Sequence, residues 1–178
     1  MTAPLWVFGY GSLVWNPGFP FAERVKARLP GFTRTFCMRS IHHRGTPEDP
    51  GLVLALDPHS DHACEGLAFR VDPGEEGGTL ATLRERELVS SAYVEETHVL
   101  DLEDGRRVDA LTYVVDTDHE QYCGGLDLET QARIIAHAHG GRGPNSEYLW
   151  NTASHLAELG IHDPDLEWLS GRVRALLI

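Results

Sequence analysis

One glutamate, Glu87, stands where proton-transfer chemistry can be expected. In the segment 79–88, a helical spacing of about 100° per residue places Glu87 near the centre of an apolar face, whereas Glu85 and Arg86 point away. The other residues of that face are Leu80, Leu83 and Leu88. A carboxylate among leucines is unfavourable unless it is paired or its pKa rises. Two interpretations stay open: a structural Glu87, either paired with Arg84 or another basic group or reaching solvent at the rim of the core, or a general base with a raised pKa.

A second feature is the run Gly9-Tyr10-Gly11-Ser12-Leu13, which leaves a short apolar segment at 5–10 that is typical of a buried strand. Glycines at such a place let backbone N–H groups turn toward an anion, such as a carboxylate or a developing oxyanion. A plain tight turn is the alternative. The run is not a dinucleotide fingerprint, because GxGxxG fails and no helical pattern follows, and it lacks the Gly-Lys-Ser/Thr of a P-loop. No G-x-S-x-G elbow supports Ser12 as the nucleophile of a triad.

A third feature is the segment 39–46, which concentrates cations in an acidic protein. Its arginines, Arg39 and Arg44, could hold an anionic substrate, or they could pair with Glu48 and Asp49 in a structural loop.

No metal site is expected. The adjacent His42 and His43 cannot comfortably face one ion, and His137 and His139 diverge by about 200° on a helix. The cysteines are odd in number, widely spaced and without a CxxC pair, so they predict packed thiols in a reducing cytosol. They are Cys37, Cys64 and Cys123.

The elements that must position these residues come as strands first, one inserted helix, and helices at the end. Strands are expected at 5–10, at 24–41 with a break at Pro30-Gly31, at 52–56 and 65–71 with a join at Asp57-Pro58, and at 93–102 and 108–115 around a turn at 103–105. A helix is expected from Asp72-Pro73 to about Ser91, with further helices from Leu128 onward, broken at 140–144 and at Gly160. Regular βαβ alternation is missing, so we predict an α+β fold in which about six strands close a small barrel flanked by helices.

Bulk properties narrow the class further. A chain of 178 residues, 42% hydrophobic and 24% charged, without a linker, predicts one domain over residues 1–178. The formal net charge of −12 disfavours nucleic acid and anionic membranes. No apolar run approaches the roughly 18 residues of a membrane span, and the N-terminal run is too short for a signal peptide. We therefore expect a cytoplasmic protein without membrane or nucleic-acid partners.

Several segments, in order, resemble the ChaC-type γ-glutamylcyclotransferases and cover most of the chain. They are Trp6-Val-Phe-Gly-Tyr-Gly-Ser-Leu-Val-Trp15, Arg39-Ser40-x-x-His43-Arg-Gly-Thr-Pro-Glu48-x-Pro50-Gly-Leu-Val53, Cys64-x-Gly66-x-Ala68-Phe-Arg70, Arg86-Glu87 with Tyr93, and Gly143-Pro-Asn145-x-Glu147-Tyr-Leu149. The one departure is Ser90-Ser91-Ala92, where many relatives carry glycine.

The resemblance implies a γ-glutamylcyclotransferase-like fold, a small mixed barrel with surrounding helices. It implies a lyase of the cyclotransferase class that cleaves glutathione to 5-oxoproline and Cys-Gly, with no cofactor or metal. The catalytic glutamate of the family falls on Glu87. Its substrate-binding loop falls on Gly9, Tyr10, Gly11, Ser12, Leu13 and Val14. Arg39, Arg44 and Tyr148 are weaker candidates for substrate contacts.

Two alternatives to the glutathione assignment remain at this stage. A cyclotransferase for other γ-glutamyl dipeptides or amines would share the same catalytic centre. A non-catalytic binding or regulatory module would be expected to lack the carboxylate that Glu87 supplies.

Overall fold

The computed structural model describes residues 3–88 and 92–178 and consists of two compact units. The first unit contains the chain up to Arg34 together with Leu56–His119, and the second contains Thr35–Ala55 and Glu120–Ile178. Each unit is described by itself below. The single domain expected over residues 1–178 stays a prediction.

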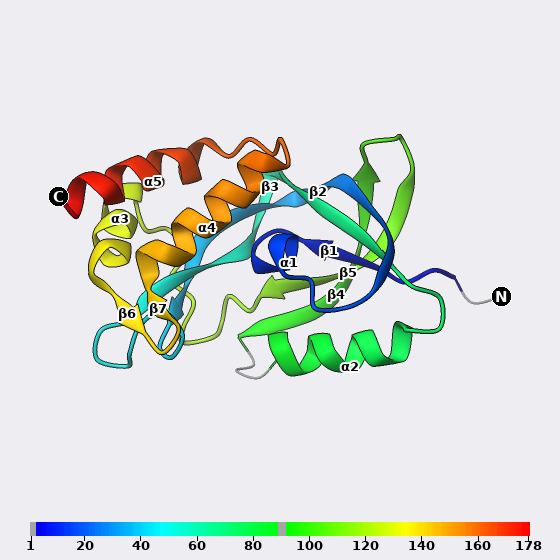
Figure 1. The fold of residues 1–178 in the computed structure, drawn as a ribbon, viewed down its shortest axis with the longest axis horizontal. Helices are drawn as coiled ribbons and strands as arrows, with labels where there is room; N and C mark the ends of the chain where they lie inside the picture. Colours follow the sequence, from blue (N-terminus) through cyan, green and yellow to red (C-terminus); the bar gives the residue numbers. More distant parts are fainter. Residues whose placement is uncertain (1–2, 89–91) are drawn as a thin grey trace. The chain divides into compact units, whose positions relative to one another are not determined.

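Five strands form a closed barrel in the order β1-β3-β2-β4-β5 (Figure 1). β1 pairs parallel with β5 and antiparallel with β3, and β4 pairs antiparallel with β2 and β5. The strands are β1 (Trp6–Gly9), β2 (Phe21–Ser40), β3 (Gly51–Val71), β4 (Tyr93–Leu102) and β5 (Arg107–Val115). The mixed pairing and the flanking helices confirm the predicted α+β barrel.

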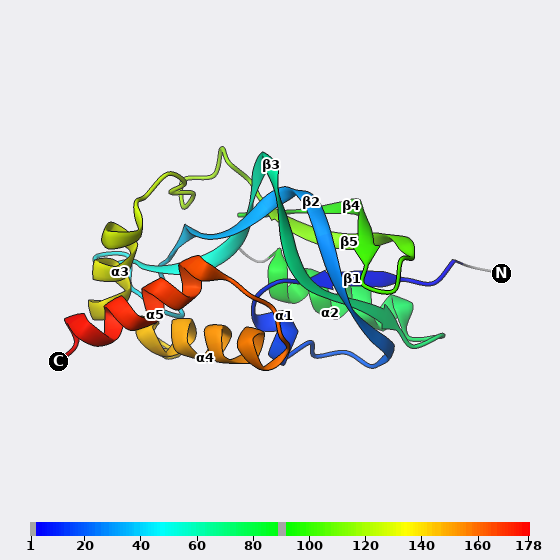
Figure 2. The same ribbon diagram turned by 90° about the horizontal axis from the view of Figure 1, so that it is seen from above.

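The two longest strands differ from the prediction, because β2 and β3 each replace two expected pieces (Figure 2). β2 runs through Pro30-Gly31, where Gly31 takes a φ of 86° that a glycine adopts without steric strain. β3 runs through Asp57-Pro58, and Pro58 is exposed, as a proline without an N–H donor should be in a strand. The barrel therefore has five strands instead of about six, because β2 and β3 are each one long strand.

Two helices belong to the first unit. The short helix α1 (Ser12–Trp15) follows β1, where no helical pattern is predicted. Helix α2 (Glu76–Glu87) begins later than the predicted Asp72-Pro73. Gly74 takes a φ of 90°, which is not a helical conformation, so the helix starts only after it. The predicted end near Ser91 lies outside the described residues, as does the departure at Ser90-Ser91.

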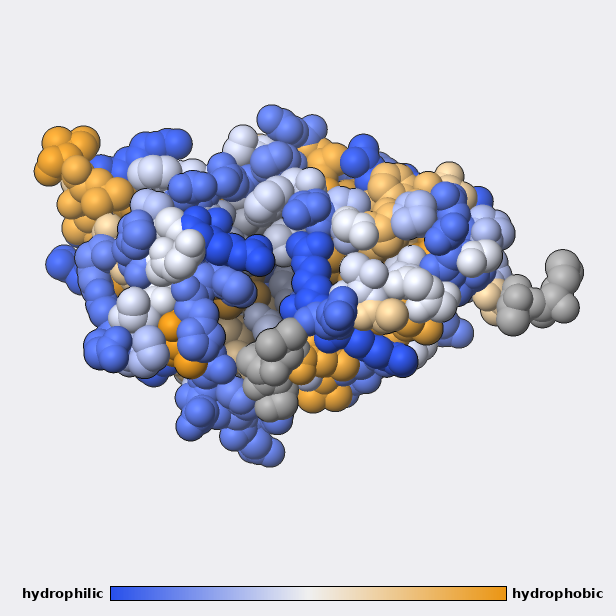
Figure 3. Space-filling model, turned by 60° about the horizontal axis from the view of Figure 1, so that its bottom comes forward, coloured by the Kyte–Doolittle hydropathy of each residue, from blue (hydrophilic) through white to orange (hydrophobic). Residues whose placement is uncertain are grey.

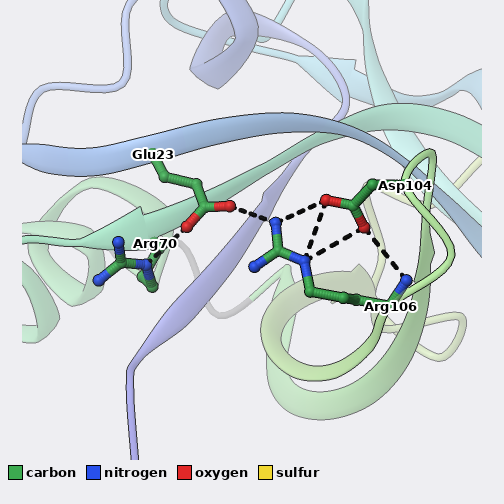
Figure 4. A network of polar contacts seen from close by, with 4 residues as sticks. All are labelled: Glu23, Arg70, Asp104 and Arg106. Atoms are coloured by element: carbon green, nitrogen blue, oxygen red, sulfur yellow. Dashed lines mark hydrogen bonds and ion pairs between the residues drawn. The ribbon is translucent and has the colours of Figure 1, made fainter.

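Polar side chains join two strands of the first unit, β2 and β3, to the β4–β5 turn at the surface (Figure 4). Glu23 on β2 accepts from Arg70 Nε on β3 at 2.8 Å and also contacts Arg106, which binds Asp104 in the β4–β5 turn at 2.7 Å. These groups are 25–46% exposed, so each pair contributes little alone. On the face drawn in Figure 3 most of the surface is hydrophilic, as the acidic composition leads one to expect.

The second unit holds the C-terminal helices and a small hairpin. Its elements are α3 (Leu128–His137), β6 (His139–Gly140), β7 (Gly143–Pro144), α4 (Asn145–Glu158) and α5 (Pro164–Leu176). The Asp127 side chain caps α3 by accepting from Thr130 N, and Asp163 caps α5 by accepting from Leu166 N, with Pro164 at the first position. These helices and their interruptions agree with the prediction. In the described part of the chain, no helix is both long and apolar enough to cross a membrane.

Candidate active site

Glu87 is the last residue of α2 and lies on the apolar side that the helical spacing predicts. Leu83, one turn earlier, is fully buried, and the Glu87 side chain is 16% exposed. Burial raises the pKa of Glu87, and the nearby charge of Arg86 opposes that rise only in part. A carboxylate with a raised pKa accepts and returns a proton closer to neutral pH than an ordinary glutamate does.

Arg84 is not the partner of Glu87. It forms a bidentate pair with Glu95 on β4, with both N···O distances at 3.0 Å. Glu95 also accepts from the Tyr113 hydroxyl on β5 at 2.9 Å. These contacts attach the last turn of α2 to the β4–β5 hairpin, beside which α2 lies in Figure 1.

Tyr113 stands within electrostatic reach of Glu87. Burial raises the pKa of Tyr113, and the carboxylates of Glu95 and then Glu87 raise it further. The phenol is therefore held protonated, and its O–H is committed to Glu95. The Arg84 hydrogen bonds are the main reason that the pKa of Glu95 is lowered, so Glu95 stays ionised while Glu87 is the carboxyl group disposed to take up a proton.

Arg86 is predicted to point away from the apolar face of α2, yet its guanidinium group reaches the α1 region. Its Nη1 donates to the carbonyl oxygen of Asn16 at 2.7 Å, and its Nη2 donates to Ser12 Oγ at 2.9 Å. Its Nε lies 3.6 Å from Glu87 Oε1. The helical phase was right for the Cβ direction, but a long guanidinium side chain reaches groups that its phase alone does not indicate.

The segment 9–14 follows β1 directly and offers backbone groups more than side chains. Leu13 and Val14 are buried in the core, with 5% and 4% exposed. A side chain on Gly9 would meet Leu13 Cβ and the Phe69 ring at 3.1 Å, so the close approach favours glycine. The N–H groups of Ser12 and Leu13, in the first turn of α1, have no acceptor within that helix. Such donors can bind an anion.

Arg34, on β2, is a positioning group that the sequence reasoning missed. It is 8% exposed, and its Nη1 donates to the carbonyl oxygens of Tyr10 at 3.0 Å and Glu65 at 2.8 Å. It thereby fixes the start of the 9–14 segment against β3. The sequence contains a sign that Arg34 is buried, because strand alternation places it on the same face as Phe32 and Phe36.

The weaker candidates lie in the second unit. Arg39 is exposed, while Arg44 is buried and donates to the Pro144 carbonyl at 3.1 Å. Arg44 also lies 5.8 Å from the centre of the Tyr148 ring, whose hydroxyl accepts from Leu54 N at 3.2 Å. Asp49 Oδ1 lies 3.1 Å from Nε2 of His137, the last residue of α3. For Arg39, Arg44 and Tyr148 a role in substrate binding stays a prediction.

Metal and thiol chemistry receive no support from the arrangement of side chains. Over residues 3–88 and 92–178, no three histidine, cysteine or carboxylate side chains form a group that could hold an ion. Cys37, Cys64 and Cys123 are buried and not joined in disulfides, as packed thiols should be. Burial raises the pKa of Cys123, so a smaller fraction of this thiol is ionised to the reactive thiolate.

Solved structures with the same architecture define the class of this fold. A yeast γ-glutamyl cyclotransferase specific to glutathione superimposes with a TM-score of 0.87 at 25% identity, covering 98% of this chain and 97% of that one. The barrel and its flanking helices are thus a γ-glutamylcyclotransferase-like fold, as the sequence predicts.

The sequence comparisons then give the family. Residues 5–176 match the profile of the ChaC-like protein family, and this chain belongs to it. A glutathione-specific γ-glutamylcyclotransferase of Escherichia coli is 37% identical over 98% of this chain and 74% of the relative. The γ-glutamylcyclotransferase 2-3 of Arabidopsis thaliana is 32% identical over 97% of this chain and 90% of the relative.

Proposed function

We propose that this protein is a glutathione-specific γ-glutamylcyclotransferase, a carbon–nitrogen lyase that releases 5-oxoproline and Cys-Gly from glutathione. The observation that carries the proposal is the largely buried Glu87 with a raised pKa, which Arg86 links to Ser12 of a backbone segment able to bind an anion. Family membership and the names of the relatives from Escherichia coli and yeast support the substrate.

Glu87 acts first as a general base. The α-ammonium group of the γ-glutamyl unit is not nucleophilic until it loses a proton, which the Glu87 carboxylate accepts. The free amine then attacks the γ-carbonyl carbon of the same unit, forming a C–N bond and a five-membered ring. Because both reacting groups belong to one molecule, the protein has mainly to hold the substrate in its folded conformation.

Glu87 acts next as a general acid. The tetrahedral intermediate collapses when the original amide C–N bond breaks and protonated Glu87 donates its proton to the departing cysteinyl nitrogen. The second proton of the ring nitrogen passes to the released amine, so that 5-oxoproline keeps one N–H and Cys-Gly leaves as its ammonium form. The carboxylate is thereby regenerated without a cofactor, metal or external oxidant. The desolvated position of Glu87 suits both directions of transfer, because its raised pKa lies closer to neutral pH than that of an exposed glutamate.

The 9–14 segment supplies the anion site of this proposal. Backbone N–H groups at Ser12 and Leu13 would bind the α-carboxylate of the substrate or the developing oxyanion. Gly9 allows the close packing of the segment against Leu13 and Phe69, and the Arg34 bond to the Tyr10 carbonyl keeps the segment in place. Leu13 and Val14 contribute by burial of their side chains.

The proposal places the protein in the cytoplasm, with a small peptide as its partner and without nucleic acid. The net charge of −12 repels a phosphate backbone, and cysteines that are not joined in disulfides suit a reducing compartment.

The substrate is tested by measuring 5-oxoproline release from glutathione, γ-Glu-Ala and γ-Glu-lysine at equal concentrations. We expect glutathione to give the highest kcat/KM. A preference for γ-Glu-Ala or γ-Glu-lysine would contradict the glutathione assignment and leave a cyclotransferase of different specificity. Release from none of the three would favour a non-catalytic module.

A further inference from the structure

Arg86 connects two parts of the first unit that the proposed chemistry needs together. It is the residue before Glu87 on α2, yet its guanidinium donates to Ser12 Oγ and to the carbonyl oxygens of Asn16 and Pro17, at 2.9, 2.7 and 3.4 Å. Two of these acceptors are backbone atoms just beyond α1, and the third is the side chain at the first position of α1. One side chain therefore links the α1 region to the last turn of α2.

The residue type matters for this link. A guanidinium is a rigid planar fork that donates in several fixed directions, whereas a lysine ammonium is a point charge on a flexible stem. Here Nη1 and Nη2 serve different acceptors while Nε faces Glu87 Oε1 at 3.6 Å. A lysine at this position would keep the charge but would lose the simultaneous contacts.

We propose that Arg86 is a positioning residue, which fixes the substrate-binding segment at Ser12 to the turn of α2 that carries Glu87. The inference deepens the proposed function and rests on it. The base lies on α2 and the substrate-binding segment leads into α1, so the two are far apart in sequence. In the described residues, the Arg86 side chain contacts both, at Ser12 Oγ and at Glu87 Oε1.

The charge of Arg86 has a second consequence. Among the described residues, the groups that face Glu87 are Arg86 on its own helix and Tyr113 on β5. Tyr113 in turn binds Glu95, whose charge is matched by Arg84. Arg86 is thus the cation that lowers the pKa of Glu87 against the rise caused by burial. Loss of this cation raises the pKa of Glu87 further.

The test separates charge from geometry with Arg86→Lys and Arg86→Gln, using Glu85→Gln as a matched surface control on the same helix. We expect kcat/KM to fall about 10- to 100-fold in both Arg86 variants, because a displacement near 1 Å suffices for that loss. The acid limb of the pH profile moves to higher pH in Arg86→Gln and stays near that of the unmodified protein in Arg86→Lys. Thermal unfolding of each variant shows whether it is folded under assay conditions.

A double-mutant cycle with Ser12→Ala examines the link itself. If Arg86 acts through Ser12, the two changes are not additive in kcat/KM, and the second substitution costs less than the first. Additive effects, or an Arg86→Gln variant with unchanged KM and unchanged acid limb, would overturn the proposal. So would a loss of activity that only follows the loss of folded protein.

A measurement without turnover keeps this inference distinct from the proposed function. The Glu87 carboxyl group is titrated by carbon-13 NMR in the substrate-free protein and in Arg86→Gln. A higher pKa in the variant supports the electrostatic role of Arg86 even if no γ-glutamyl substrate is cleaved, in which case the proposed function alone fails. An unchanged pKa refutes that role.

Discussion

Removal of a single oxygen atom in Tyr113→Phe tests the contacts that hold the β4–β5 hairpin beside Glu87. The Tyr113 hydroxyl donates to Glu95 at 2.9 Å, and the side chain is 2% exposed. Phenylalanine has nearly the same shape, so the substitution removes the hydrogen bond and leaves the packing in place. The perturbation is therefore specific to one contact.

The size of the effect follows from the partners that remain. A hydrogen bond to a charged group contributes about 1.5–3 kcal/mol. Glu95 still keeps its bidentate pair with Arg84, so we expect a loss of about 1.5–2 kcal/mol, toward the lower end of that range. For a chain of this size, that corresponds to a decrease in Tm of roughly 3–8 °C.

The assay is urea and thermal unfolding of both proteins at neutral and at acidic pH. Hydrogen bonds from Arg84 and Tyr113 lower the pKa of Glu95. Their contribution to the stability of the folded protein is therefore fully present above the ordinary pKa of 4.5 and is lost as the pH falls through the lowered pKa. The difference between the two proteins should therefore shrink in acid, and it should also shrink in a Glu95→Gln background. A difference below about 0.5 kcal/mol at neutral pH, within the scatter of neutral surface substitutions, would refute the reasoning. An equal loss in the Glu95→Gln background would do so as well.

Three further changes have defined outcomes. Because burial raises the pKa of Glu87, ionisation of this carboxyl group destabilises the folded state as the pH rises above 4.5. Glu87→Gln should therefore be more stable than the unmodified protein at pH 7, by about 1.4 kcal/mol for each unit by which the pKa is raised. Urea unfolding at pH 4 should show no such gain. Asn145 is fully buried and exchanges two 2.8 Å hydrogen bonds with the backbone of Leu52, so Asn145→Ala should lose about 2–5 kcal/mol in urea unfolding, and a loss under 1 kcal/mol would contradict this. Arg34→Met removes the hydrogen bonds to the Tyr10 and Glu65 carbonyls, so the free energy of unfolding should fall by about 1–3 kcal/mol for each bond. Turnover should fall as well. Unchanged unfolding and unchanged turnover would exclude the positioning role of Arg34.

Local patterns were enough for elements whose contacts are local. The hairpin at 93–115 was predictable because strand alternation, a turn at 103–105 and the return strand follow one another in the chain. The phase of Glu87 was predictable because α2 keeps its periodicity up to its last residue. The C-terminal helices were predictable because Asp163 and Pro164 mark a helix start with a known physical mechanism.

Features that depend on distant partners were not predictable in this way. The continuity of β2 and β3 arises from pairing within the barrel, which overrides the turn signals at Pro30 and Pro58. Helix α1 (Ser12–Trp15) follows β1 and has only four residues. So short a helix shows no hydrophobic periodicity by which the sequence could predict it. The roles of Arg34 and Arg86 depend on where a long side chain reaches after the chain has folded, and a helical wheel gives only the direction in which that side chain starts.

The role of Glu87 as the proton-transfer residue is tested most directly by 5-oxoproline release from glutathione in Glu87→Gln, with Glu85→Gln as the control. Glu85 is exposed two residues away on the same helix, so both variants should fold and only one should lose the base. The account predicts almost no 5-oxoproline from Glu87→Gln and nearly unchanged release from Glu85→Gln. Sustained turnover in a folded Glu87→Gln protein would contradict it.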